Sequence, residues 1–128
     1  MDNLTLYTYQ AKLIRILDAD TMEVDIDLGF GVVLAKRKLR LDGLDSPEIK
    51  TPEGVIAKDA TENWLKENTT IKKQLTISTT YVTFQSISDK PDKYGRILAK
   101  VIGKDGTTLN EYLVETGMAK SYDGGKRN

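Results

Sequence analysis

The stretch Thr21–Leu28, with the sequence TMEVDIDL, alternates without a break between polar and apolar side chains. In an extended chain this alternation places one set on one face and the other set on the opposite face, which predicts a half-buried β-strand. The apolar set is Met22, Val24, Ile26 and Leu28, and the acidic set is Glu23, Asp25 and Asp27.

Short turn segments join this strand to a neighbour on each side. Asp18–Asp20 separates it from Leu6–Leu17, in which aromatic and aliphatic residues are interspersed with polar ones. Gly29–Gly31 separates it from Val32–Leu41. Links as short as these join antiparallel strands, so we expect three consecutive antiparallel strands.

The second half of the chain predicts two helices and two further strands. One segment has an apolar stripe at helical spacing, and another begins with a capping box and ends at a glycine. The helices are expected over Val55–Glu67 and Thr108–Gly117, and the strands over Leu75–Phe84 and Ile97–Ile102.

The segment Leu44–Gly54 is expected to be a loop, because Pro47 and Pro52 oppose a helix there. Three strands, a helix, further strands and a last helix predict an α+β protein. The expected architecture is a five-stranded Greek-key β-barrel of the OB-fold type with two or three helices packed on it. We expect residues 1–128 to form a single domain.

The composition excludes several kinds of site. The chain of 128 residues contains neither cysteine nor histidine, which excludes disulfides and the usual zinc and copper ligand sets. A bound metal would therefore be a hard cation held by oxygen atoms. The N-terminus is acidic, and no apolar run approaches membrane-spanning length, so we expect a cytoplasmic protein without membrane contact. The formal net charge is zero, so attraction to a polyanion would need local clusters of Lys and Arg.

Charged residues that suit one kind of chemistry gather in three short segments. Arg40–Glu48 contains an arginine, several acidic residues and a proline turn, Asp18–Thr21 adds a further carboxylate, and Asp92–Arg96 adds a second arginine. Two arginines, two carboxylates for a cation and one carboxylate to act on water are the groups needed to cleave a phosphodiester bond. The sequence therefore predicts a small metal-dependent nuclease.

Asp20 and Asp45 are the candidate carboxylate ligands of the cation. A hard divalent cation needs several oxygen ligands, and these two residues would lie on segments that meet at one end of the barrel. Pro47 biases Ser46 toward an extended conformation, which leaves the Ser46 carbonyl free to act as a neutral ligand. The alternative is that both aspartates are turn or loop residues, the more common role for either one alone.

Glu48 is the candidate base, and Arg40 and Arg96 are the candidate phosphate ligands. A glutamate is a weak base, but a cation lowers the pKa of bound water by several units, so the two together can generate hydroxide. A guanidinium binds phosphate oxygens in pairs and stabilises charge that grows in the transition state. The alternatives are a solvated surface glutamate and surface arginines in weak ion pairs.

Four further residues are candidate substrate contacts. Lys50 and Lys93 can add contacts to phosphate, whereas Tyr94 and Tyr122 can touch a terminal phosphate or stack on a base. The alternatives are lysines on a solvated face and tyrosines that belong partly to the barrel core.

The three charged segments, together with Asn110–Glu111 and Gly117–Ala119, carry a resemblance to a known family. In their order and spacing they resemble the signatures of the staphylococcal nuclease (thermonuclease) family, and the likeness extends over essentially the whole chain. The long turn around Gly29–Gly31 is similar to that of small members encoded by bacteria and phages. Two positions depart from the family pattern, because Ala19 replaces a usual glycine and Ser46 replaces threonine.

The resemblance implies an OB-fold and calcium-dependent hydrolysis of DNA and RNA that leaves 3′-phosphate and 5′-hydroxyl ends. It also implies residue roles by position. Asp20, Asp45 and the Ser46 carbonyl would bind calcium. Arg40 and Arg96 would bind the phosphate, and Glu48 would act on water. Lys93 and Tyr94 would contact a terminal phosphate. The expectation of calcium rather than Mg²⁺ or Mn²⁺ rests on this likeness alone.

The expected partner is a nucleic acid in the form of single-stranded DNA, RNA or a loosened duplex, and the chain is expected to be a monomer. The alternative from another class is a catalytically silent OB-fold module that binds nucleic acid or protein. Such modules typically lose the arginines and acidic residues, whereas Arg40, Asp45, Glu48 and Arg96 all remain here.

Overall fold

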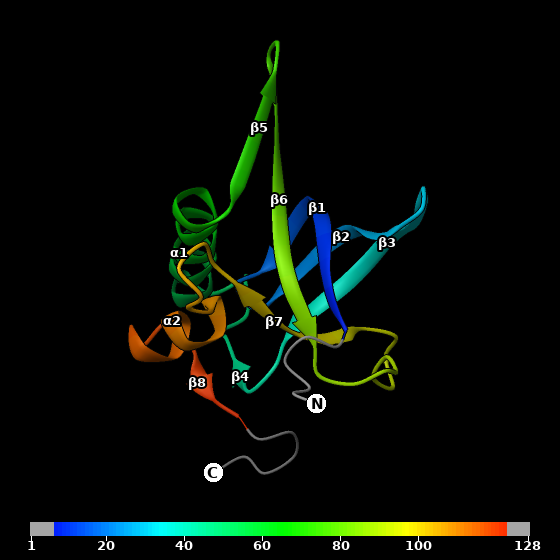
Figure 1. The fold of residues 1–128 in the computed structure, drawn as a ribbon. Helices are drawn as coiled ribbons and strands as arrows, with labels where there is room; N and C mark the ends of the chain where they lie inside the picture. Colours follow the sequence, from blue (N-terminus) through cyan, green and yellow to red (C-terminus); the bar gives the residue numbers. More distant parts are fainter. Residues whose placement is uncertain (1–6, 123–128) are drawn as a thin grey trace.

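Five strands form a closed ring in the computed structural model, which describes residues 7–122 (Figure 1). The strands of the molecule are β1 (Thr8–Asp18), β2 (Thr21–Gly29), β3 (Val32–Leu41), β4 (Leu44–Asp45), β5 (Thr70–Gln74), β6 (Ile77–Ser86), β7 (Ile97–Ile102) and β8 (Lys120–Ser121), and the helices are α1 (Pro52–Asn68) and α2 (Leu109–Glu115). The ring has the order β1-β2-β3-β7-β6, and it closes because β6 also pairs with β1. β5 extends the sheet beyond β6, and β4 pairs with β8 in a separate small sheet.

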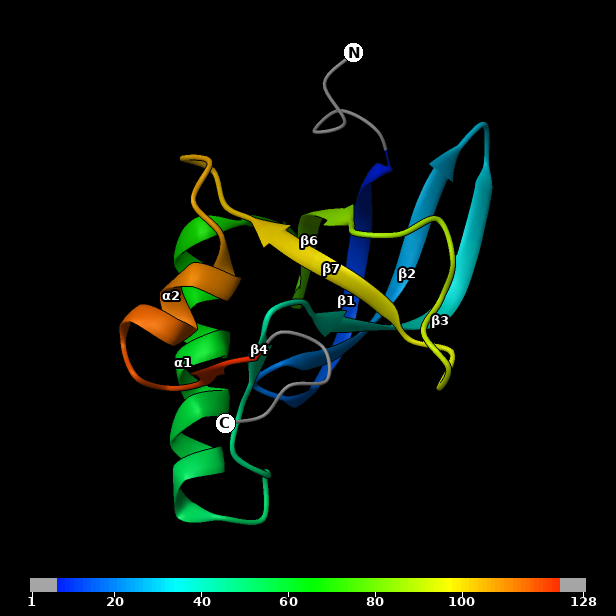
Figure 2. The ribbon, with the colours of Figure 1, turned by 90° about the horizontal axis from the view of Figure 1, so that it is seen from below.

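The pairing directions are those of an OB-fold. Neighbours in the ring are antiparallel except β3 and β7, which run parallel where Leu39–Leu41 lies beside Ile97–Ala99. Both helices pack on the same side of the barrel (Figures 1 and 2). The predicted α+β class and five-stranded Greek-key barrel are therefore confirmed, with two helices in the part of the chain that the structure describes.

The apolar face of β2 lies in the core, as its alternation predicts. Met22, Val24 and Ile26 are at most 2% exposed. Leu28, the last residue of the same face, is 38% exposed, which the alternation does not predict. The reason is that the β2–β3 hairpin projects beyond the ring, so its end has no opposite wall to pack against (Figure 1). The predicted first strand includes Leu6, which lies outside the described residues.

Helix α1 begins earlier than the sequence predicts. The expected loop reaches Gly54 and the expected helix begins at Val55, but α1 begins at Pro52. A proline is compatible with the first helical position, because its missing N–H would have no partner there. Thr51 is the N-cap, and its hydroxyl accepts a hydrogen bond from the Gly54 N–H at 3.0 Å.

The strand predicted over Leu75–Phe84 is displaced in the structure. β5 ends at Gln74, Leu75 lies in the turn with φ 58°, and β6 runs from Ile77 to Ser86. All five residues of β5 are exposed, so this edge strand has no buried face and therefore no alternation that a sequence pattern can reveal. Backbone pairing with β6 alone defines it.

Helix α2 follows its sequence signals at both ends. The Thr108 hydroxyl accepts a hydrogen bond from the Glu111 N–H at 3.1 Å, which is one half of the predicted capping box. The Glu111 carboxylate accepts from the Thr108 hydroxyl at 3.2 Å, where the other half of a capping box would use the Thr108 backbone N–H. After the helix, Gly117 takes a positive φ, and the Met118 N–H returns to the Leu113 carbonyl at 2.9 Å. Neither helix in the span 7–122 is long and apolar enough to cross a membrane.

The start of α1 lies against the backbone of the loop that carries Glu48. A Cβ atom placed on Gly54 would be 1.8 Å from the Glu48 carbonyl oxygen and 2.9 Å from the Ile49 Cα. The same carbonyl accepts hydrogen bonds from both the N–H and the hydroxyl of Thr51, at 2.9 and 2.7 Å. The position of Glu48 therefore depends on a glycine in the first turn of the helix.

We predict that Gly54→Ala destabilises the protein by about 3 kcal/mol, because a backbone carbonyl cannot move aside as a flexible side chain can. Alanine is otherwise favoured over glycine inside a helix, so the sign of the effect tests the close approach. Urea unfolding measures the change, and Val55→Ala, at an exposed neighbouring position, is the control. A stabilised Gly54→Ala variant would contradict the proposed contact.

Candidate active site

Arg40, at the end of β3, lies between two carboxylates from other parts of the chain. Its Nη1 atom is 2.9 Å from Asp20 Oδ2, and its Nη2 atom is 2.7 Å from Asp45 Oδ1. Nη1 also donates to the Leu41 carbonyl at 3.2 Å. The side chains of Arg40 and Asp20 are only 12% and 8% exposed, so salt screens these ion pairs less than it screens surface pairs.

The turn between β1 and β2 presents Asp20 to this arginine. Asp20 Oδ1 accepts a hydrogen bond from the Thr21 hydroxyl, and Oδ2 accepts one from the Ser46 N–H, both at 3.0 Å. Helix α1 holds the turn itself, because the buried Thr61 hydroxyl donates to the Ala19 carbonyl at 2.8 Å. The Asp20 carboxylate is therefore fixed by contacts from three chain segments.

The oxygen atoms of Asp20, Asp45 and Ser46 suit a hard cation. The Ser46 hydroxyl is buried and has no hydrogen-bond partner within residues 7–122. An unpartnered buried hydroxyl is costly, and an added ligand would relieve that cost. Two carboxylates and one guanidinium also leave a net negative charge. Among residues 7–122 no group of three or more His, Cys, Asp or Glu side chains could hold a metal, so a cation here would depend on two carboxylates and neutral oxygens.

A tight turn before β7 holds Arg96. Its Nε atom donates to Asp92 Oδ2 at 3.0 Å, and its backbone N–H donates to Asp92 Oδ1 at 2.8 Å. The Tyr94 N–H donates to the same Oδ1 at 2.9 Å. The Arg96 guanidinium and the Lys93 ammonium lie 5.1 and 5.2 Å from the centre of the Tyr94 ring, within the range of cation–π attraction.

The charge of Asp92 is stabilised in this turn. Burial raises its pKa, but the backbone hydrogen bonds from Arg96 and Tyr94 and the Arg96 side chain together outweigh burial, so the pKa lies below the ordinary value of 3.8. Asp92 therefore remains ionised and holds Arg96 at neutral pH.

Both candidate phosphate ligands line one pocket at the rim of the barrel. Arg40 and Arg96 share its wall with Lys93, Tyr94 and Tyr122. An adjoining pocket, which shares Tyr122, is lined by Asp45 and Ser46. Seen from below, β4, β8 and the end of β3 lie together near β7 (Figure 2).

Asn110 on α2 joins the strands that carry the two arginines. Its side-chain amide donates to the Asp42 carbonyl at 2.9 Å and to the Ala99 carbonyl at 3.0 Å, while its Oδ1 accepts from the Val101 N–H at 3.1 Å. Asp42 follows β3 directly, whereas Ala99 and Val101 belong to β7. The buried Asn110 side chain thus sets the spacing between β3, which contains Arg40, and β7, which begins directly after Arg96.

The structure does not bring every predicted residue into the pocket. Glu48 and Lys50 are exposed on the loop before α1 and do not line the wall that contains Arg40 and Arg96. The backbone of Glu48 is fixed by Thr51, but its carboxylate accepts no hydrogen bond from residues 7–122 and points to a solvated region.

The sequence predicted no supporting role for Asp92, Thr61 or Asn110, although Asp92 and Asn110 lie in segments that carry the family resemblance. Asp92 could have been found, because an acid four residues before an arginine is a recognised pairing signal. Thr61 gave no such signal, since threonine in a helix is common and its partner is a distant backbone carbonyl. Asn110 belongs to the family pattern, but its contacts to distant backbone groups could not be predicted from that pattern.

The chain is similar in sequence to several known proteins. Residues 38–128 match the family model described as staphylococcal nuclease homologue. A thermonuclease of Staphylococcus hyicus is 32% identical over 125 residues, which cover 94% of this chain and 63% of that protein. An uncharacterized endonuclease of Escherichia coli is 32% identical over 112 residues, which cover 88% of this chain and 60% of the relative. Endonuclease YhcR of Bacillus subtilis (strain 168) is 31% identical over 118 residues, 89% of this chain but 9% of the relative. The chain thus spans about three fifths of the first two relatives and a small part of the third.

We predict that Asp92→Asn lowers the free energy of unfolding by about 1 kcal/mol near neutral pH, because it removes a charge-assisted contact to Arg96. The folded-state pKa of Asp92 is lowered, so this stabilisation is complete above 3.8 and is lost as the pH falls through the lower folded value. The stability difference between wild type and variant should therefore shrink in acid. Urea unfolding at several pH values measures it, with the exposed Asp89→Asn as control. A difference that stays constant down to about pH 2 would be inconsistent with this role.

Proposed function

The chain belongs to the staphylococcal nuclease family, and on that premise we propose that it is a calcium-dependent endonuclease. It hydrolyses phosphodiester bonds of DNA or RNA and leaves 3′-phosphate and 5′-hydroxyl ends. The names of its relatives, thermonuclease and endonuclease, support a nuclease, and the site geometry supports the residue roles given below.

The observation that carries the proposal is that Arg40 and Arg96 line one pocket beside the carboxylates of Asp20 and Asp45. A phosphodiester seated there meets two guanidinium groups. Both stabilise the negative charge that grows on the phosphoryl oxygens during attack.

Arg40 can serve the carboxylates and a phosphate at once. Its contacts to Asp20, Asp45 and the Leu41 carbonyl use at most three of the five N–H groups of a guanidinium. The remaining donors can reach a phosphate oxygen. Arg96 is positioned by Asp92 through its Nε atom, which leaves its terminal nitrogens for the same phosphate.

Glu48 is the proposed base. Its exposed carboxylate accepts a proton from the attacking water as the new O–P bond forms and the bond from phosphorus to the 5′ oxygen breaks. Arginine is a poor proton donor, so solvent supplies the proton for the leaving 5′ oxygen. Glu48 lies outside the arginine pocket, on the loop between β4 and α1, so this role requires its exposed carboxylate to reach the attacking water from that loop.

Asp20, Asp45 and the Ser46 carbonyl are the proposed calcium ligands, with Mg²⁺ or Mn²⁺ as less favoured ions. A bound divalent cation would lower the pKa of water and offset phosphate charge. The protein's own contribution is to hold both carboxylates close together, which Arg40 and the Ser46 N–H do.

The remaining pocket residues are the proposed substrate contacts. Lys93 and Tyr94 bind a terminal phosphate, Tyr122 offers a ring to a base, and Lys50 adds charge near the loop. Paired arginines contact backbone phosphates and carry no sequence information, so the substrate is single-stranded DNA, RNA or a loosened duplex without strong base preference.

We predict that Glu48→Gln lowers calcium-dependent cleavage of denatured DNA by about 10²- to 10⁴-fold, because the amide cannot accept a proton. Stability should not change, since the side chain is exposed. Glu53→Gln, another exposed glutamate at the start of α1, is the control and should cleave normally. Full activity of Glu48→Gln would refute its role as the base. Intact DNA with salt-sensitive binding by the wild type would instead identify a silent binding module.

We predict that Asp45→Asn weakens calcium binding by about tenfold or more, because it removes one of only two carboxylates that can bear the charge of the ligand set. Isothermal titration with calcium measures the affinity. Asp42→Asn is the control, because Asp42 lines the pocket with Arg40 but is not a proposed ligand. Unchanged calcium affinity in Asp45→Asn, or cleavage that continues in excess chelator, would exclude this cation site.

A further inference from the structure

Two hairpins project from the barrel, β2–β3 to the right and β5–β6 to the top in Figure 1. Their ends are residues 25–33, DIDLGFGVV, here named the acidic tip, and residues 71–79, IKKQLTIST, here named the basic tip. The acidic tip contains two aspartates and no basic residue, and the basic tip contains two lysines and no acidic residue. The two tips therefore have opposite charge.

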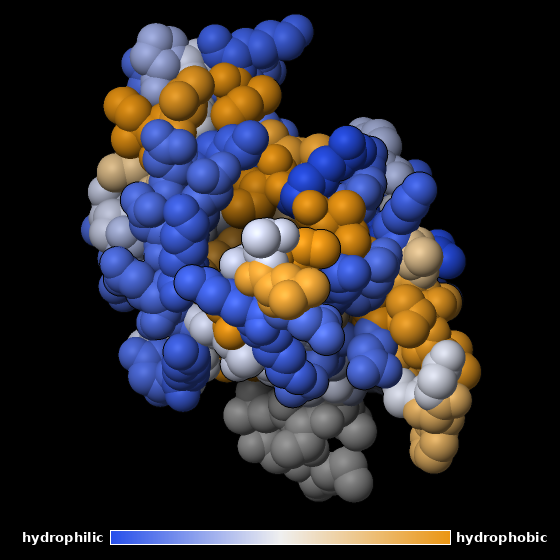
Figure 3. Space-filling model, turned by 90° about the horizontal axis from the view of Figure 1, so that it is seen from above, coloured by the Kyte–Doolittle hydropathy of each residue, from blue (hydrophilic) through white to orange (hydrophobic). Residues whose placement is uncertain are grey.

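Both tips also expose large apolar side chains. Phe30 is 104% exposed, Leu75 100% and Ile77 68%. Phe30 and Leu75 have φ values of 57° and 58°, a conformation that is unfavourable for bulky side chains. Seen from above, apolar surface lies at the centre and at the right-hand edge, with hydrophilic surface around it (Figure 3). Exposed apolar groups of this kind mark interaction surfaces.

The charges of the tips have no ion-pair partner within residues 7–122. Asp25 and Asp27 on one tip and Lys72 and Lys73 on the other form none of the ion pairs of this region. Asp25 and Asp27 each accept a backbone hydrogen bond with Oδ1 only, so Lys73 and the other carboxylate oxygens are available for a partner of complementary charge.

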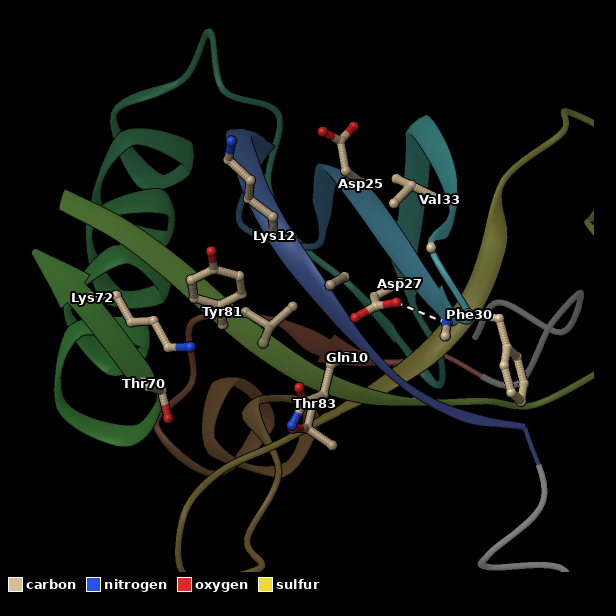
Figure 4. Close-up of a pocket in the computed structure, with 14 residues that line it drawn as sticks. Gln10, Lys12, Asp25, Asp27, Phe30, Val33, Thr70, Lys72, Tyr81 and Thr83 are labelled. Atoms are coloured by element: carbon tan, nitrogen blue, oxygen red, sulfur yellow. Dashed lines mark hydrogen bonds between the residues drawn. The ribbon is translucent and has the colours of Figure 1, made fainter. Parts of the chain in front are cut away.

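A groove of about 760 Å³ lies between the two hairpins. One side presents Asp25, Asp27 and Phe30, and the other presents Lys72 and Tyr81 (Figure 4). The Lys72 ammonium lies 5.1 Å from the centre of the Tyr81 ring, so this lysine already has a partner within its own chain. Lys12 of β1 also lines the groove and is the register partner of Asp25, whereas the register partner of Asp27 is Gln10. Asp27 is therefore the groove carboxylate that has no lysine opposite it in the β1–β2 pairing.

We propose that two copies of this chain associate through these hairpins, with the basic tip of each copy seated in the groove beside the acidic tip of the other. A two-fold axis then creates two identical contacts. In each contact Leu75 and Ile77 of one copy cover Phe30 of the other, and Lys73 of the first approaches Asp27 of the second. Each contact covers the exposed apolar groups and pairs charges that are unpaired in the monomer.

Other occupants fit the charges less well. The groove is lined by two aspartates and two lysines, so its formal charge is zero and it offers no net attraction to the phosphates of a nucleic acid or of an anionic lipid surface. Direct pairing of β5 with β5 of a second copy would bring Lys72 and Lys73 next to their own copies, and like charges across paired strands are destabilising.

The proposed contact leaves the candidate active site accessible. The residues that line the groove and those that line the pocket with Arg40 and Arg96 have no member in common. The dimer would therefore present two separate arginine pockets, and its existence does not depend on the proposed function.

The test is sedimentation equilibrium of the full chain at increasing concentration. At low salt the mass should rise from 14.3 kDa toward twice that value, and salt at about 1 M should weaken the association by screening. Phe30→Ser and Asp27→Asn should each raise the dissociation constant by about tenfold or more. Asp27→Asn keeps the oxygen that accepts the Gly29 N–H at 2.8 Å, so the turn can remain folded.

A charge exchange makes the test specific. Asp27→Lys and Lys73→Asp should each be monomeric alone, because both contacts of a homodimer then oppose like charges. An equal mixture should associate, because each of its two contacts again joins opposite charges. Controls on exposed positions of α1 are Ile56→Ser for the apolar change and Asp59→Lys for the charge change, and both should associate as the wild type does.

A wild-type mass that remains that of one chain at about 1 mM and low salt would overturn the proposal. So would association that Phe30→Ser and Asp27→Asn leave unchanged, or a mixture of the exchanged variants that stays monomeric while each is folded. A monomer whose tips bind anionic vesicles or DNA would equally overturn it and assign the tips to that partner.

Discussion

One guanidinium that contacts two carboxylates sets the arrangement of the rim. Arg40, Asp20 and Asp45 come from the end of β3, the β1–β2 turn and β4, and all three side chains are partly or largely shielded from water. A shielded charge loses hydration and needs an opposite charge nearby, so each of these groups is acceptable only when the others are present. The ion pairs therefore join three distant segments at one end of the barrel. The turn with Arg96 leads into β7, which pairs with β3, and Tyr122 follows β8, which pairs with β4.

Ion pairs tolerate a range of geometries, so charge attraction alone cannot fix where the charged residues lie. Neutral side chains fix the backbone positions of the segments that carry them. Thr61 binds the carbonyl of the turn that carries Asp20, and Asn110 bridges the strands that carry the two arginines. Gly54 lets α1 approach the backbone of Glu48. In each case a helix residue fixes the backbone next to a charged residue. The helices packed on the barrel are therefore what orients the candidate site, although the three charged side chains that form the ion pairs lie outside them.

The sequence reveals those parts of this fold that have a buried face or a terminal signal. The alternation of Thr21–Leu28 was sufficient to predict β2, and the capping signal of Thr108 was sufficient to predict the start of α2. Burial and capping both leave a pattern in the local sequence. β5 leaves none, since its residues are exposed on both faces, and Pro52 was misjudged because a proline is compatible with a first helical turn. Residue types likewise identified the charged groups of the candidate site. Their pairing could not be predicted, since the contact of Arg40 with both aspartates depends on how strands far apart in the chain meet.

In the proposed site, Arg40 would connect cation binding and phosphate binding through charge. In the protein alone, this guanidinium offsets part of the negative charge of Asp20 and Asp45, so it is a weaker attractor for phosphate than a free arginine. A cation shared by the two aspartates would replace that compensation and leave more of the positive charge of Arg40 for the phosphate. By thermodynamic linkage, a bound phosphate must then strengthen cation binding by the same factor. In the proposed function, a ligand set with only two carboxylates would therefore bind the cation tightly only when the substrate is present.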